Sequence, residues 1–263
     1  MRRESVYNLA EITMVIAILL LSLSLRWLYT ELNPLLYRDS SLYCHIARAW
    51  SQIGDFERAN ENLGGTAPLY VYLLKIGVDW GIPVMKWGRF LAFFFSGAFV
   101  LAFYFLGKTL FPGRRDGALI CMLLAGVHPI IGRLSIALLR EGPFVVLAAL
   151  AMVAFVRAFQ SGSVKDACLC GVLLGAAALT RHEAAELLLL GSMALLPWRW
   201  RNEANINNAD APNRSPARFR RWLPPLAMLI SALAAMIVLL ILMGIPLSFL
   251  MHQYLSKLDK VKL

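Results

Sequence analysis

Seven apolar stretches, separated by polar or charged segments, set the pattern of this chain of 263 residues. A helix that crosses a bilayer needs about 20 mostly apolar residues, and most of the stretches approach that length. The pattern therefore predicts an all-α polytopic membrane protein with about seven transmembrane helices. The stretches are 12–29, 89–110, 117–139, 143–159, 167–180, 184–198 and 223–249.

Two of the stretches, 167–180 and 184–198, are short. At this length, a hairpin that is buried in the protein or only dips into the membrane competes with two full spans. Either arrangement returns the chain to the same side, so the predicted topology of the other helices does not change.

The segment 31–87, after the first apolar stretch, is predicted to be an ordered extracytoplasmic loop with two helices. Apolar residues recur at helical spacing in 40–53 and predict an amphipathic helix at the membrane interface. Asp39 and Ser40 are natural N-cap residues for this helix. Pro68 favours the start of a second helix in the sequence PLYVYLLKIGVDW. A long loop that contains helices of its own is usually functional.

The composition supports an integral membrane protein. Of all residues, 59% are hydrophobic and only 16% are charged, whereas soluble domains contain about 45–50% apolar and about 25% charged residues. The four cysteines form no CxxC motif, so we interpret them as packing residues. No small-residue cleavage site follows the first apolar stretch, which we interpret as a retained helix and not a signal peptide.

The positive charge is concentrated in particular segments. Lys and Arg total 26 against 16 acidic residues, which gives a net charge of +10. With a cytoplasmic N-terminus, the basic residues fall mainly in cytoplasmic segments, above all in the Arg-rich loop 199–222. Membrane proteins concentrate Lys and Arg in such loops. This rule accounts for the net charge without a nucleic-acid partner.

Several ionisable residues fall on the opposite side of this predicted topology. They are Asp39, Arg133, Arg140, Glu141, Arg181 and Glu183. Ionisable residues at membrane spans are costly, and they are usually paired or functional. Arginines bind phosphate bidentately, and a carboxylate can act as a general base. Together these residues predict a site for an anionic ligand embedded in the membrane.

Each of these residues also has a purely structural interpretation. Asp39 can cap a helix, Glu141 can favour a helix N-terminus, and Arg133 can extend to lipid headgroups. Arg181 and Glu183 can form a tight charged turn. The residues all fall on the same side of the predicted topology, however, and this favours a shared ligand site over separate structural roles.

Five segments occur in a characteristic order: RDSSLY after the first apolar stretch, IGDF, APLY, the acidic Glu141 and the turn ALTRHE. In this order they resemble the GT-C superfamily of membrane glycosyltransferases, specifically the protein-mannosyltransferase and aminoarabinose-transferase type of glycosyltransferase family 39. That family has similar Asp-Glu-x-x-Tyr, Pro-Pro-Leu-Tyr and Leu-Thr-Arg-Pro-Glu segments. The resemblance covers residues 12–198.

The resemblance implies an enzyme that transfers a sugar from a polyprenyl-phosphate-linked donor to an extracytoplasmic acceptor, which would be a lipid, a glycan or a protein. It implies Asp39 as the catalytic carboxylate, which would activate the acceptor or organise a divalent metal such as Mg²⁺ or Mn²⁺. Arg181, with Arg140 or Arg133, would meet the donor phosphate. The further substrate-binding candidates are Arg38, Tyr43, His45, Asp55, Tyr70, Glu141 and Glu183. We expect an integral protein of a bacterial inner or plasma membrane.

The chain departs from the family pattern at three points. The acidic residue expected after Asp39 is Ser40, the proline expected after Arg181 is His182, and the apolar stretches end after the seventh. If the second acid is needed, Asp55 is the candidate that would replace it.

These departures leave a second hypothesis open, namely a non-catalytic or truncated GT-C-like membrane subunit. In both hypotheses we expect residues 1–263 to form one GT-C-like module that lacks the C-terminal region of the family. A small transporter or flippase is a third hypothesis. It predicts ionisable groups near the bilayer midplane and two related halves, whereas this sequence has no internal repeat.

Overall fold

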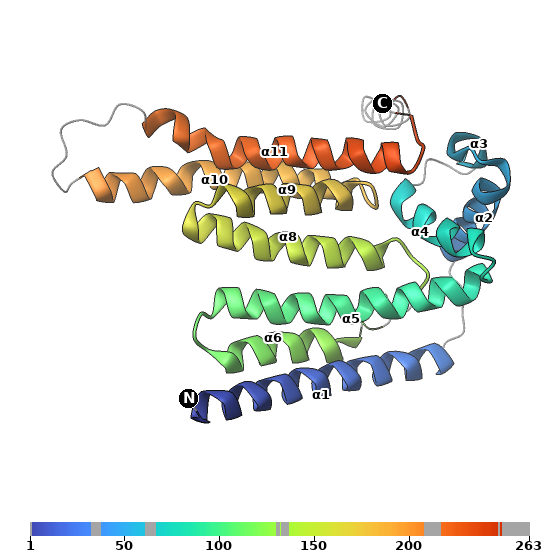
Figure 1. The fold of residues 1–263 in the computed structure, drawn as a ribbon, viewed down its shortest axis with the longest axis horizontal. Helices are drawn as coiled ribbons and strands as arrows, with labels where there is room; N and C mark the ends of the chain where they lie inside the picture. Colours follow the sequence, from blue (N-terminus) through green and yellow to red (C-terminus); the bar gives the residue numbers. More distant parts are fainter. Residues whose placement is uncertain are drawn as a thin grey trace.

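The computed structural model describes residues 2–32, 38–60, 67–129, 132, 137–207, 217–246 and 248. This part of the chain is helical and contains no strand. Seven helices lie side by side in an elongated bundle (Figure 1). They are α1 (Arg2–Leu32), α5 (Val84–Leu110), α6 (Arg115–Val127), α8 (Glu141–Ser161), α9 (Val164–Ala178), α10 (Glu183–Asn207) and α11 (Ala217–Leu242).

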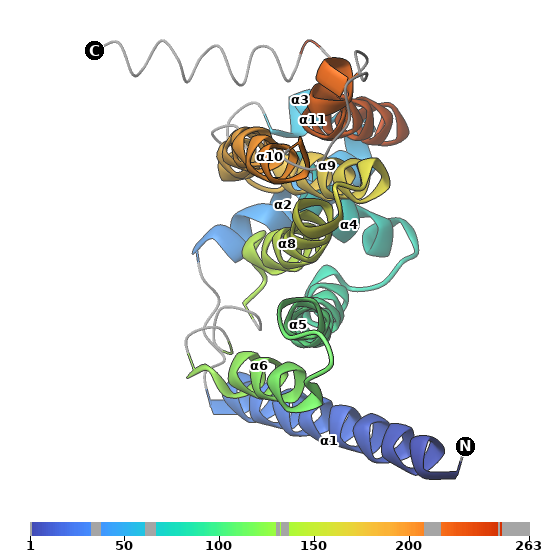
Figure 2. The same ribbon diagram turned by 90° about the vertical axis from the view of Figure 1, so that its left-hand side faces the viewer.

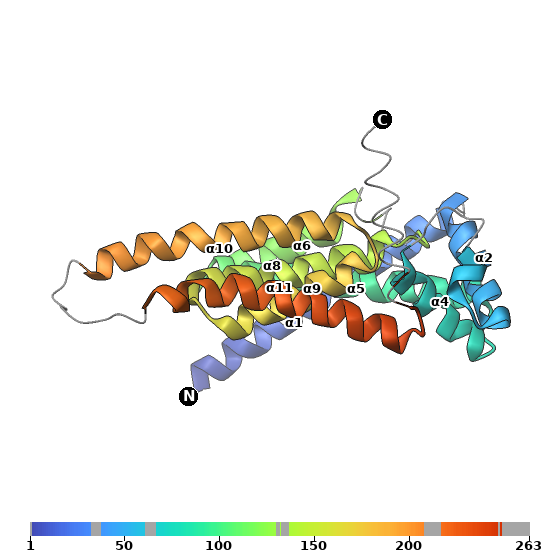
Figure 3. The same ribbon diagram turned by 90° about the horizontal axis from the view of Figure 1, so that it is seen from above.

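Three short helices gather at one end of this bundle, which we call the loop end. They are α2 (Arg38–Ile53), α3 (Phe56–Asn60) and α4 (Pro68–Asp79). Seen from above, α2 and α4 lie at the end opposite the C-terminal end of α10 and the N-terminal end of α11 (Figure 3). The end where α10 ends and α11 begins is called the basic end below.

The long helices are stacked in a regular order (Figure 2). At one side α1 packs against α6, and α5 packs against both α6 and α8. At the other side α9 lies between α8 and α11, and α10 contacts α9 and α11. Both α9 and α10 run along the bundle between its two ends (Figure 1).

Four helices in the described part of the chain are long and apolar enough to cross a membrane. These candidate spans are Leu9–Glu31, Val84–Leu110, Glu141–Ser161 and Leu223–Leu242. Many of their large apolar side chains are exposed, as expected for helices in contact with lipid. The prediction of a helical, integral membrane protein is confirmed by these spans. The other three predicted stretches form α6, α9 and α10.

Three predicted boundaries are corrected by the structure. The stretch 117–139 is not one continuous helix, because α6 ends at Val127 and the extended His128 precedes a proline. The last helix ends at Leu242 and not at residue 249.

The predicted polar loop 199–222 is also shorter than expected. Helix α10 continues through Asn207 and α11 begins at Ala217, so helix enters this segment from both sides. Residues 208–216 lie outside the described residues.

Two glycines allow α9 and α11 to pack closely. A Cβ atom at Gly171 would lie 2.1 Å from the carbonyl oxygen of Met228, and one at Gly175 would lie 2.4 Å from that of Ala232. Small residues four positions apart let helix backbones approach each other in membranes. This contact holds the two helices at the side of the bundle that lies farthest from α1.

One buried arginine has a structural role that the sequence did not predict. Arg26 in α1 is 1% exposed, and its guanidinium donates to the backbone oxygen of Gly126 at 2.8 Å and to Ser22. The last carbonyls of a helix lack partners within that helix. Arg26 therefore satisfies the end of α6 from the neighbouring helix.

The basic end carries cationic residues at or next to the helix ends where α5 meets α6 and where α8 meets α9. They are Lys108, Arg114, Arg115, Arg157 and Lys165. The carboxylate of Glu11 in α1 forms ion pairs with Lys108 and Arg115, with N···O distances of 2.9 and 3.5 Å. These pairs join α1, α5 and α6. The predicted separation of these basic residues from the acidic and basic pairs of the loop end is therefore present in the structure.

Candidate functional site

Helix α2 brings the first group of candidate residues to the loop end. It begins at Arg38, so Asp39 and Ser40 lie in its first turn and are not the N-cap residues that we predicted. Its apolar face packs against α3 and α4 and is buried there, whereas we predicted that this face would lie on the membrane interface. The buried residues of this face are Tyr43, Cys44, Ile46, Ala47 and Trp50.

Aromatic contacts fix α2 on its neighbours. The rings of Tyr43 and Tyr70 meet edge to face with centroids 5.7 Å apart. Trp50 packs against Phe56 of α3 at 4.6 Å and against Tyr72 of α4 at 5.5 Å. Such pairs favour tilted or edge-to-face arrangements, which hold both helices in one orientation.

The start of α4 is attached to the turn between α9 and α10. Pro68 occupies the first turn of α4, as predicted, and the backbone N–H of Leu69 donates to the carbonyl oxygen of Leu179 at 3.0 Å. This hydrogen bond places Tyr70 beside the turn that carries Arg181. The loop between α1 and α5 is thus tied to the helical bundle at this point.

Arg181 is the centre of an ion-pair cluster. Its Nη1 atom donates to Oε1 of Glu141 at 2.7 Å, and its Nε and Nη2 atoms donate to both oxygens of Glu183 at 3.2 and 2.5 Å. The guanidinium also lies over the ring of Phe144, 5.7 Å from its centroid. The first residues of α8 and α10 are therefore joined through one arginine.

The pKa values reflect these contacts. The hydrogen bond from Arg181 lowers the pKa of Glu183 to about 2, and the same bond raises the pKa of Arg181. Both groups therefore keep their charges throughout the physiological range.

Tyr43 lies where the candidate residues of α2, α8 and the α9–α10 turn meet. Burial raises the pKa of its phenol, and the charges of Arg140, Asp39, Glu141 and Arg181 also act on it. Burial likewise raises the pKa of Tyr70. Both phenols therefore remain protonated and can donate a hydrogen bond.

Four buried polar atoms around this cluster have no hydrogen-bond partner among the described residues. They are Oγ of Ser40, the hydroxyl of Tyr70, Nε of Arg140 and Oε2 of Glu141. A buried polar group without a partner costs about 1–3 kcal/mol. The donors and acceptors left open here are suited to a ligand that carries both hydroxyl and anionic groups. We call these residues, with Asp39, Tyr43, Arg181 and Glu183, the loop-end cluster.

The remaining candidates are not joined to this cluster by a described contact. Asp55 caps α3 by accepting from the N–H of Glu57 at 2.9 Å, and it pairs with Arg58 at 3.5 Å. His45 is exposed on α2. Arg133 and the side chain of Arg38 lie outside the described residues.

That Asp39 organises a divalent metal stays a prediction. No three His, Cys, Asp or Glu side chains in the described ranges come together as metal ligands. The cysteines are free, with Cys44 and Cys170 buried, which agrees with their interpretation as packing residues.

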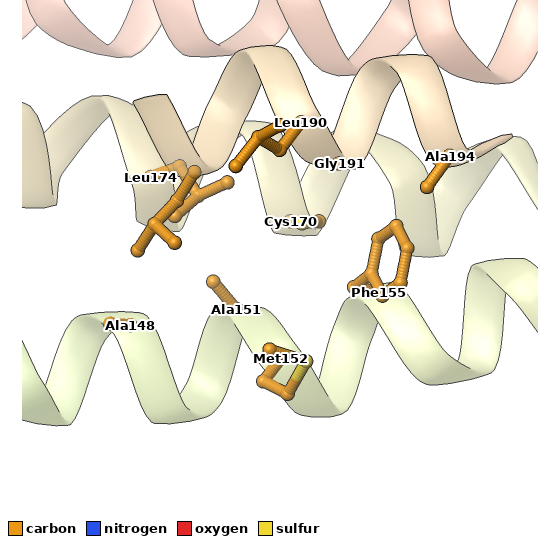
Figure 4. Close-up of a pocket in the computed structure, with 10 residues that line it drawn as sticks. Ala148, Ala151, Met152, Phe155, Cys170, Leu174, Leu190, Gly191 and Ala194 are labelled. Carbon is orange, nitrogen blue, oxygen red and sulfur yellow. The ribbon is translucent and has the colours of Figure 1, made fainter. Parts of the chain in front are cut away.

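An apolar groove lies between α8, α9 and α10, with a volume of about 240 Å³ (Figure 4). Small residues such as Ala148 and Gly191 leave the space, and Phe155 and Leu190 border it. The full lining consists of Ala148, Ala151, Met152, Phe155, Cys170, Leu174, Leu187, Leu190, Gly191 and Ala194.

The groove and the loop-end cluster lie along the same two helices. With a rise of 1.5 Å per residue, Ala148 is about 10 Å along α8 from Glu141, and Leu187 is about 6 Å along α10 from Glu183. A polar site therefore stands at one end of an apolar groove within a membrane-spanning bundle. This arrangement accommodates a ligand with a polar head and a long apolar tail.

The fold and the site together define a polytopic helical membrane protein that is suited to an amphipathic, anionic ligand. A family model described as dolichyl-phosphate-mannose-protein mannosyltransferase matches residues 66–206, which is more than half of the chain. The chain belongs to this family of GT-C membrane glycosyltransferases, which confirms the family that the sequence analysis expected. No curated protein matches the chain.

Proposed function

We propose that this membrane glycosyltransferase transfers a sugar from a polyprenyl-phosphate donor to an acceptor outside the cytoplasm. The observation that carries the proposal is the apolar groove along α8 and α10, next to the loop-end cluster. A polyprenyl chain fits the groove chemically, and the phosphate and the sugar hydroxyls match the open donors and acceptors of the cluster. The family of the chain supports the same donor class.

Asp39 is the proposed catalytic base. It is exposed in the first turn of α2 and acts electrostatically on Tyr43, so it lies at the edge of the cluster where an acceptor can enter. Its carboxylate would take the proton of the acceptor hydroxyl as that oxygen attacks the anomeric carbon of the sugar. The bond from the sugar to phosphate breaks, and its electron pair leaves with the polyprenyl phosphate. A nearby guanidinium stabilises the negative charge that develops there.

The distribution of charge supports an extracytoplasmic site. Lys108, Arg114, Arg115, Arg157 and Lys165 lie at the end of the bundle opposite the loop-end cluster. Because basic turns stay in the cytoplasm, we propose that the basic end is cytoplasmic and that transfer occurs on the other side.

A second candidate function, a non-catalytic subunit, is favoured by one observation. The position after Asp39, where the family has an acid, is Ser40, which is 1% exposed and has a hydroxyl without a partner among the described residues. A chain that lacks the second acid could bind the lipid-linked sugar without transferring it.

The test uses purified full-length protein in nanodiscs, a panel of radiolabelled polyprenyl-phosphate sugars, and membranes as the source of acceptor. Donor binding and the appearance of label in acceptor are both measured for the wild type. Binding with transfer supports the proposal. Binding without transfer to any acceptor supports the non-catalytic subunit, and the absence of binding overturns both.

A further inference from the structure

The environment of Arg181 is unfavourable for a second anion. Two carboxylates, Glu141 and Glu183, already surround its single positive charge, so the three groups carry a net negative charge. Three of its five N–H donors are used in these contacts. A phosphate would have to displace a carboxylate to bind Arg181 directly, and the remaining carboxylate would repel it.

Arg140 has the opposite environment. Within the described part of the chain it forms no ion pair, and its Nε atom is buried without a hydrogen-bond partner. A buried charged donor without a partner is costly, and an anionic ligand removes that cost. Arg140 also belongs to the same site, since its charge acts on Tyr43 together with those of Glu141 and Arg181.

The position of Arg140 also suits a phosphate that leads into an apolar tail. It immediately precedes α8, the helix that contributes Ala148 and Phe155 to the groove. Ala148 is about 12 Å along the helix from Arg140 at 1.5 Å per residue. A phosphate on the guanidinium would thus stand at the loop end of the groove.

Glu141 is held in place by Arg181. Its Oε1 atom accepts from Arg181 at 2.7 Å, whereas its Oε2 atom is buried and has no partner among the described residues. Arg181 itself is fixed by Glu183 and by the ring of Phe144. The arginine therefore leaves one defined oxygen of Glu141 open for a hydroxyl group.

We infer that Arg140 binds the donor phosphate, and that Arg181 is a positioning residue that orients Glu141 toward a hydroxyl of the donor sugar. This inference rests on the proposed function and divides the roles within its site. It separates the roles of two arginines that the sequence analysis expected to meet the donor phosphate together.

The first experiment measures binding of radiolabelled farnesyl phosphate, which has a lipid phosphate but no sugar, to the purified full chain in detergent. We expect Arg140→Gln to weaken binding at least tenfold and Arg140→Lys to restore part of it. Arg181→Gln should keep binding within about threefold of wild type, since its charge is already balanced. Arg58→Gln is the control, because it removes an exposed positive charge from the same end of the bundle.

The second experiment measures donor KM and kcat for the same variants and for Glu141→Gln. If Arg181 acts through Glu141, Arg181→Lys lowers kcat with little change in KM. The double variant Arg181→Gln/Glu141→Gln then has the same kcat as Glu141→Gln alone. Additive effects of Arg181→Gln and Glu141→Gln would overturn the positioning role. A purely structural role would instead lower the melting temperature and the amount of folded protein.

Equal loss of farnesyl phosphate binding in Arg181→Gln and Arg140→Gln, or unchanged binding in Arg140→Gln, overturns the inference while the transferase function stands. Wild-type protein that binds farnesyl phosphate through Arg140 but transfers no sugar supports the phosphate assignment and overturns the proposed transfer. The two failures are therefore distinguishable.

Discussion

The Nη1 atom of Arg181 lies 2.7 Å from Oε1 of Glu141, and this contact joins the turn before α10 to the first residue of α8. The same two helices border the apolar groove, so the ion pair stands at the loop end of that groove. The hydrogen bond from Leu69 to Leu179 brings α4, and with it α2, to the same place. The candidate site is thus assembled from four separate parts of the chain.

Replacing Asp39 by asparagine tests the proposed base. Asp39→Asn keeps the size of the side chain but removes its ability to take a proton, so we expect transfer to fall by about 10²–10⁴-fold with donor binding unchanged. Initial rates and donor binding would be measured on the same preparation. Asp116→Asn is the control, because Asp116 is an exposed acidic residue in the first turn of α6 at the other end of the bundle. Equal activity of Asp39→Asn and wild type would exclude Asp39 as the base.

Narrowing the groove tests whether it holds the polyprenyl chain. Ala194 lines the groove and is exposed, so Ala194→Phe adds volume there at little cost in folding. We expect a donor KM at least fivefold higher for long-chain donors, and little change for a donor with two isoprene units, which is too short to reach this far. Its neighbour Met193 is 65% exposed and does not line the groove, so Met193→Phe is the matched control. An equal rise in KM for short and long donors would argue against the groove as the chain site.

Much of the architecture could be predicted, because helices that face lipid or pack on other helices carry apolar residues in recognisable patterns. The amphipathic spacing in 40–53 predicted α2, and Pro68 predicted the start of α4. The long apolar runs predicted α1, α5, α8 and α11. The predicted gathering of Asp39 with the Arg181 turn at one end also agrees with the structure, because alternate spans return the chain to the same side.

Other features depend on contacts between distant residues and have no local signature. The different environments of Arg140 and Arg181 could not be predicted, because they arise from the positions of the Glu141 and Glu183 side chains in the folded protein. Arg26 resembled an ordinary charge at the end of a span, and only its contact with Gly126 identifies its partner. The groove arises from small residues on three helices. The sequence of each helix alone predicts only an apolar segment, so the groove could not be predicted.

The pH dependence of stability should reflect the Arg181–Glu183 pair. The pKa of Glu183 is lowered to about 2, so its ionised form stabilises the folded protein above the ordinary pKa of 4.5. This stabilisation is lost as the pH falls from 4.5 through about 2. The difference in melting temperature between wild type and Glu183→Gln should therefore be constant from pH 8 to about pH 5 and shrink below that. Melting curves in one detergent would measure it, and a difference that disappears between pH 7 and pH 6 would contradict this assignment.

The close approach of α9 and α11 predicts a strong effect of a single methyl group. In Gly175→Ala the new Cβ would lie 2.4 Å from the carbonyl oxygen of Ala232 and 3.0 Å from its Cα atom. These are backbone atoms of a packed helix, so the two helices must separate, and overpacking of this kind costs about 1–3 kcal/mol. We therefore expect a clear fall in the melting temperature of the purified protein.

Gly97→Ala is the matched control for this substitution. A Cβ atom at Gly97 would meet only the side chains of Leu19 and Leu23, at 3.7 and 3.8 Å, which are ordinary contact distances. Because alanine is the better helix former by about 1 kcal/mol, this variant should be as stable as wild type or slightly more stable. If Gly175→Ala melts at the same temperature as Gly97→Ala, α9 and α11 do not pack as closely as their backbones indicate. Loss of stability in Gly175→Ala alone would establish that contact as the one that fixes α11 against the helix leading to Arg181.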